Sequence, residues 1–142
     1  MTGRSPGATE VEGNGRTVSL TVPAKPEYLV LARLALSAVC RLTPLQPEEV
    51  ADLKLAVTEA ATGRISAAAR GGDTTGEEPP PIALMFSLGD EELVLEVQGA
   101  AGPTRGDDEW ELGRAIIEAT VDHCTESEES IRLVKFLNRP AE

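Results

Sequence analysis

The polar residues best suited to chemistry fall on one face of a helix that we expect over residues 47–68. Asp52, Glu59 and Ser66 place two carboxylates and a hydroxyl on this face, and Gly63 lies among them. Residues four apart on a helix share a face, so Glu59 and Gly63 border the same space. Carboxylates are common groups in acid–base chemistry. This face is therefore the one to inspect for a site.

The other reactive side chains give no sign of a catalytic or metal site. His123 is the only histidine, and no serine or cysteine with an aspartate can be placed beside it. We therefore interpret it as a surface or helix-end residue. Cys40 and Cys124 lie in apolar sequence without the spacing of a metal site, which indicates buried reduced thiols. A redox role for either thiol stays open.

A first helix, expected over residues 27–42, precedes the helix with the polar face. Its apolar stripe consists of Leu29, Ala32, Leu36, Val39 and Cys40. Further apolar residues, including Leu34, cover much of the remaining surface, and such a helix is usually buried on more than one side. One side can meet the core of the domain. The other can meet a second chain, with Arg33, Ser37 and Arg41 as its polar contacts.

The helix with the polar face begins near Pro47. Proline suits the first helical position, and Glu48 and Glu49 suit the positive end of the helix dipole. The core stripe of this helix consists of Val50, Leu53, Val57, Ala60, Ala61, Ile65 and Ala68. Because this stripe faces the core, the polar face is turned away from it.

Four strands and a third helix complete the predicted domain. The strands span residues 18–22, 82–88, 92–97 and 130–137, and the helix spans about 110–121. Residues 70–81 and 99–108 read as loops. The order β-α-α-β-β-α-β predicts an α/β two-layer sandwich, with a mixed, mostly antiparallel sheet and helices on one face. We expect the folded domain over residues 17–138 and a disordered tail over residues 1–16.

The charge of the chain limits the partners that it can bind. The formal net charge of the 142 residues is −11, which argues against direct contact with nucleic acid, because phosphate binding needs clusters of Lys and Arg. An acidic surface suits a basic protein partner, although it also serves solubility alone. The sequence contains neither a stretch long and apolar enough to span a membrane nor an apolar signal core. We therefore expect a cytoplasmic protein with no membrane contact.

Three strings in the chain resemble one protein family. Residues 52–62 (DLKLAVTEAAT) resemble the N-box helix of the anti-sigma factor serine kinases, the RsbW/SpoIIAB-like branch of the GHKL ATPases with the Bergerat, or histidine-kinase-like, fold. Residues 22–28 (VPAKPEY) and 131–137 (IRLVKFL) look like the start and the final strand of the same proteins. The order and spacing of the strings extend the resemblance from about residue 17 to residue 137.

The resemblance implies both partners and an activity. Members of the family bind an RNA polymerase sigma factor, and many use ATP and magnesium to phosphorylate a serine on a STAS-domain anti-anti-sigma factor. They generally work as homodimers. Partner binding in the family uses the first helix and an arginine in it, a position that Arg33 matches. We therefore expect Arg33, Leu34, Ser37 and Arg41 to bind the partner.

The resemblance also gives the positions of an ATP site. Glu59 matches the general base, whereas Gly63 replaces the asparagine that binds magnesium. Gly99, or the residue after it, stands where an aspartate would bind adenine. Only Leu112 and Gly113 remain of the glycine-rich turn that binds phosphates at a helix N-terminus. The sequence therefore predicts a vestigial base, no bound ATP or magnesium, and no enzyme.

The main functional prediction is an anti-sigma factor without kinase activity. It would sequester an alternative sigma factor, and a STAS-domain antagonist would release that factor by competition. Two alternatives stay open. One is an active ATP-dependent serine kinase of the antagonist that uses Glu59 as its base. The other is a regulatory module that binds only a STAS-domain protein.

Overall fold

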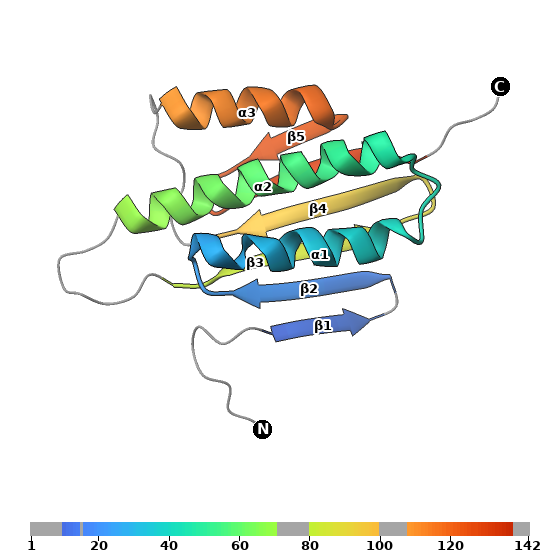
Figure 1. Cartoon of the computed structure of the whole chain (residues 1–142), viewed down its shortest axis with the longest axis horizontal. Helices are drawn as coiled ribbons and strands as arrows, with labels where there is room; N and C mark the ends of the chain where they lie inside the picture. The colour runs from blue at the N-terminus through green and yellow to red at the C-terminus, as the bar shows by residue number, and fades with distance from the viewer. Residues whose placement is uncertain (1–9, 15, 71–79, 100–107, 138–142) are drawn as a thin grey trace.

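The computed structural model describes residues 10–14, 16–70, 80–99 and 108–137, which form one sheet with helices on one of its faces (Figure 1). Within these residues, the strands are β1 (Glu10–Asn14), β2 (Thr17–Val22), β3 (Ile82–Leu88), β4 (Glu92–Gln98), β5 (His123–Glu126) and β6 (Ser130–Phe136). The helices are α1 (Leu29–Cys40), α2 (Pro47–Arg70) and α3 (Asp108–Thr120). This architecture confirms the predicted α/β sandwich.

The strands of the sheet lie in the order β1-β2-β3-β4-β6-β5, and each neighbouring pair is antiparallel. The sheet is therefore antiparallel throughout its described part, not mixed. The sequence analysis did not predict two of the strands, β1 and β5, and both lie at the edges of the sheet. β1 falls within the expected tail over residues 1–16, so disorder is wrong for Glu10–Asn14. β5 is only four residues long, and its weak apolar pattern gave no strand prediction.

The core lies between the sheet and the helices. In β3 and β4 every second side chain is buried, from Ile82 to Leu88 and from Leu93 to Val97. Successive side chains of a strand point to opposite faces, so this alternation leaves only one face fully covered. Leu36 of α1 and Leu53 of α2 are fully buried in the same core. The described residues of both predicted apolar stripes therefore face the sheet.

The helices lie side by side, with α2 between α1 and α3 (Figure 1). A short 3-10 helix, Pro26–Tyr28, precedes α1, so the α-helix begins two residues later than predicted. Two predicted loops fall largely outside the described residues, because residues 71–79 and 100–107 are not described. No described helix has both the length and the apolarity that crossing a membrane requires.

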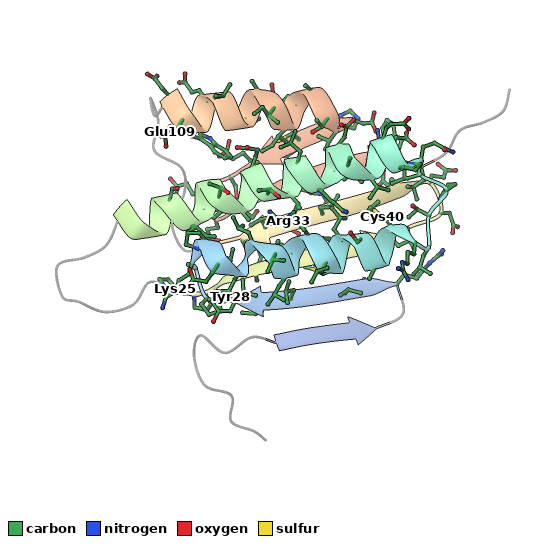
Figure 2. All side chains as sticks on the ribbon, viewed as in Figure 1. Lys25, Tyr28, Arg33, Cys40 and Glu109 are labelled. Carbon is green, nitrogen blue, oxygen red and sulfur yellow. The ribbon has the colours of Figure 1, made fainter. Side chains whose placement is uncertain are left out.

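Cys40 allows a test of the packing at the end of α1 (Figure 2). Both cysteines are free, and Cys40 is buried. Burial raises the pKa of the Cys40 thiol from 9.0 to about 11, while the charge of Lys54 opposes the shift. At pH 8 we expect Cys40 in the folded protein to react with iodoacetamide about 100-fold more slowly than in urea, because thiolate is the nucleophile. Peptide mass spectrometry measures both rates.

The same shift predicts how stability changes in alkali. Because the folded thiol keeps its proton above the unfolded pKa of 9.0, deprotonation favours the unfolded chain between pH 9.0 and about 11. Stability should therefore fall with rising pH in this window, and the fall should be smaller in Cys40→Ala. Equal alkylation rates for the folded and unfolded thiol would contradict the packing described here.

Candidate functional site

The polar face of α2 meets α3, and this contact contains the candidate site. Glu59 and Gly63 are half-buried where α3 packs on α2. Asp52 is exposed and lies seven residues earlier, about 10 Å along the helix axis, so the structure does not bring it to Glu59. Ser66 is half-buried, beyond Gly63. The site therefore centres on Glu59 and Gly63 and on the residues of α3 opposite them.

Trp110 covers the position where the family resemblance expects a magnesium ligand. A Cβ atom built on Gly63 would lie less than 3.0 Å from the six-membered ring of Trp110, closer than real Cβ atoms come to other groups. Trp110 therefore rests directly on the backbone of α2. Glycine in a helix costs about 1 kcal/mol relative to alanine, but here it leaves the space that the indole fills.

Glu59 and Gly113 form the second contact between α2 and α3. A Cβ at Gly113 would lie 2.8 Å from Oε1 of Glu59 and 3.8 Å from the ring of Trp110. The carboxylate of Glu59 thus lies against the backbone of α3, one turn from the indole. Glu59 and Gly113, two residues that the resemblance assigns to the ATP site, are in fact neighbours.

Arg64 occupies the space beside the expected adenine site. It is the one buried polar or charged side chain in the described part of the chain. A Cβ at Gly99 would lie 3.3 Å from both Cβ and Cδ of Arg64. The guanidinium donates hydrogen bonds to the carbonyls of Ser127 (3.0 Å) and Glu128 (2.8 Å). Burial lowers the pKa of Arg64, and the charge of Glu126 opposes this shift.

The middle of α3 is anchored independently of Trp110. Arg114 makes an ion pair with Glu126 of β5 and another with Glu118, four residues along the same helix. Ile117 is fully buried in the core. The first turn, by contrast, carries exposed Asp108, Glu109 and Glu111, and Trp110 is its only half-buried residue. The two parts of α3 are therefore held by separate contacts.

Two of the side-chain contacts that the resemblance expects for magnesium and ATP are absent from the described residues. Gly63 and Gly99 offer no side-chain oxygen, and Trp110 and Arg64 fill the spaces beside them. No group of three His, Cys, Asp or Glu side chains in the described segments is placed to hold a metal ion. Glu59 is the one expected ATP-site carboxylate that the chain retains.

The predicted partner-binding residues separate into two environments. Leu34 and Arg41 are exposed on α1, whereas Arg33 and Ser37 are half-buried. Nη1 of Arg33 donates a hydrogen bond of 3.3 Å to Oγ1 of Thr58, so this side chain reaches towards α2 (Figure 2). The structure therefore leaves Leu34 and Arg41 free for a partner, while Arg33 lies between two helices.

Sequence reasoning missed Trp110 and Arg64, although both left a signal. Arg64 lies four residues after Ala60 and seven after Val57, which are core positions, so the helical period alone places it inside. The signal for Trp110 is Gly63 itself, because a glycine within a helix leaves room for a large neighbour. Which aromatic residue fills that room depends on how α3 packs, and the sequence does not give this.

Comparisons with known proteins match most of the chain. A family model described as a histidine kinase-like ATPase domain matches residues 22–135. The serine-protein kinase RsbW of Bacillus licheniformis is 31% identical over 122 residues, which cover 84% of this chain and 73% of the relative. RsbW of Bacillus pumilus is 33% identical over 121 residues with the same coverage. RsbW of Listeria innocua is 35% identical over 80 residues, 56% of this chain and 48% of the relative.

These comparisons overturn two predictions made from the sequence. The predictions of no enzyme and of no ATP or magnesium are wrong, because the matched domain is a kinase-like ATPase and the relatives are named serine-protein kinases. Those predictions interpreted Gly63 as the loss of a magnesium ligand and Gly99 as the loss of an adenine contact. A missing side chain shows only that one contact is absent, and it does not show how the rest of the site binds a nucleotide.

The buried contacts of Arg64 predict a large effect on stability. Arg64→Ala removes the donors to the carbonyls of Ser127 and Glu128, and should lower the free energy of unfolding by about 3 kcal/mol. Arg16→Ala is the matched control. It removes an exposed ion pair with Asp90 and should cost less than about 1 kcal/mol. Urea unfolding followed by circular dichroism measures both, and equal losses would refute the anchoring role.

Proposed function

Because the chain belongs to the histidine kinase-like ATPase family, in its RsbW-like branch, we propose that it is an ATP-dependent serine-protein kinase that regulates a sigma factor. Its substrate is a serine of a STAS-domain antagonist. The same protein binds the sigma factor and keeps it from RNA polymerase. Phosphorylation of the antagonist leaves the sigma factor bound, and an unphosphorylated antagonist releases it.

Glu59 is the observation that supports this activity. Two relatives named serine-protein kinases align with 84% of the chain, and the base position of the family resemblance is still a glutamate. Its carboxylate lies at the contact between α2 and α3, against Gly113. The resemblance expects the phosphates of ATP at the start of the helix after the lid, whereas Gly113 lies in the second turn of α3, which begins at Asp108. A glutamate is thus present at the position that the resemblance gives to the base.

The outer surface of α1 supports the protein-binding part of the proposal. Val30 and Leu34 lie one turn apart on α1, and Leu42 lies in the turn just after its last residue, Cys40; they leave 47%, 60% and 74% of their surface exposed. We call these three residues the α1 ridge. Exposed Arg41 lies beside Leu42 and supplies a charge next to this apolar row. Apolar residues flanked by arginine are typical of protein interfaces.

The proposal also gives the protein a location and an assembly state. A regulator of sigma factors works in the cytoplasm, where those factors meet RNA polymerase. The family resemblance implies a homodimer. The first helix and the strand before it, α1 and β2, are the candidates for its surface. Light scattering of the purified protein measures the assembly state directly.

Kinase activity is tested with purified STAS-domain proteins from the same organism and radiolabelled ATP. Magnesium-dependent transfer of phosphate to a serine is expected with the wild-type protein. Glu59→Gln should reduce the rate by about 100-fold or more, because general base catalysis typically contributes at least that factor. Glu91→Gln, which changes an exposed carboxylate between β3 and β4, is the control and should retain the full rate. No phosphoserine with any STAS-domain protein would exclude the kinase.

One substitution in the α1 ridge, compared with a control substitution on another helix, tests whether the ridge binds the partner. Leu34→Glu puts a charge at the centre of the ridge and should weaken sigma-factor binding by about 10-fold or more. Leu112→Glu is the control, because Leu112 of α3 is equally exposed (65%) and lies on a different helix. The sigma factor is first captured from lysate and identified, and affinities are then measured by calorimetry. Equal affinities for both variants would place the interface elsewhere.

A further inference from the structure

The contact of Trp110 with Gly63 conflicts with nucleotide binding. The family resemblance expects ATP near the polar face of α2, yet in the structure an indole ring covers this face at Gly63. We propose that Trp110 is an autoinhibitory side chain, which holds the site closed and leaves Gly63 when magnesium-bound ATP binds. This inference rests on the proposed kinase function and adds a means of regulation to it.

The six-membered ring of Trp110 occupies the space that a side chain at position 63 would need. Any other residue at position 63 would bring a Cβ within 3.0 Å of the ring. Trp110 is half-buried and packs against the edge of the core, so it covers the site from that edge. A side chain in such a place can leave without unfolding the core residues around Leu53 and Val57.

The anchoring of α3 defines which part can move. Ile117 is fully buried and Arg114 is paired with Glu126, so the middle of the helix stays in place. Trp110 lies one turn earlier, before Gly113. Glycine lowers the local helix propensity by about 1 kcal/mol relative to alanine, so the helix bends or unwinds most easily there. The moving unit is therefore the first turn of α3, with Gly113 as the hinge.

The release of Trp110 changes which groups of the site a nucleotide can reach. While the indole covers Gly63, the carboxylate of Glu59 lies between α2 and the backbone of Gly113. Displacing the first turn uncovers Gly63 and frees space beside Glu59, on the face that carries the retained base. A partner protein that stabilises the displaced first turn of α3 would raise the affinity for nucleotide. A partner that stabilises the closed position would lower it. Binding of ATP is thus linked to the position of one side chain.

Fluorescence gives a direct test, because Trp110 is the only tryptophan in the chain. Titration of the wild-type protein with magnesium-bound ATP, or with a non-hydrolysable analogue, should shift Trp110 emission to longer wavelength and increase acrylamide quenching. Calorimetry on the same samples measures nucleotide affinity independently of the fluorescence. This measurement needs no substitution, so it decides the question even where a variant does not fold.

Two variants and a control extend the test. Gly63→Ala should shift the emission without nucleotide, because its Cβ displaces the ring, whereas Thr62→Ala, exposed one residue earlier, should not. Trp110→Ala should bind magnesium-bound ATP about 10-fold more tightly than the wild type, as expected where the open form is about one-tenth populated. Nucleotide binding with unchanged emission and equal affinities would overturn the inference alone. No binding by either protein would overturn the kinase proposal and the inference with it.

Discussion

The packing of Trp110 of α3 on Gly63 of α2 is the contact on which the candidate site depends. It sets the distance between the two helices, because no side chain at position 63 separates them. This close approach brings Glu59 against the backbone of Gly113 and covers the polar face of α2. The same contact places the indole over Gly63, where the family resemblance expects a magnesium ligand. Membership of the family indicates a kinase-like ATPase domain, and under the proposed autoinhibition the position of α3 would control access to its site.

The scaffold beneath this contact does not depend on it. The alternating buried residues of β3 and β4 and the buried faces of α1 and α2 form one continuous core. Arg64 joins α2 to the turn between β5 and β6 through two backbone carbonyls, and it fills the space beside Gly99. A rigid layer of this kind allows the first turn of α3 to move while the sheet and the central helix keep their positions.

The sequence correctly predicted the helices and strands at the centre of the fold. It did not predict the edge strands or the side-chain contacts between distant segments. Strong periodicity identified α1, α2, β3 and β4, since a buried face imposes a regular apolar pattern. The edge strands β1 and β5 are short, and pairing in the sheet determines them more than their own composition. Glu59, Gly63 and Gly113, which the family resemblance assigned to one site, lie close to one another, but Trp110 and Arg64 were missed, because their contacts come from packing between distant segments. The inference from missing side chains to lost activity was the main error.

Hydrogen–deuterium exchange with and without magnesium-bound ATP tests the central claim most directly, because it follows the backbone of α3 residue by residue. We predict faster exchange at the amides of Leu112 to Ala115 when nucleotide binds, because their N–H groups donate to the carbonyls of the first turn of α3, with unchanged exchange in β3 and β4. Nucleotide binding that leaves exchange at these amides unchanged, or slows it, would show that α3 does not control access to the site.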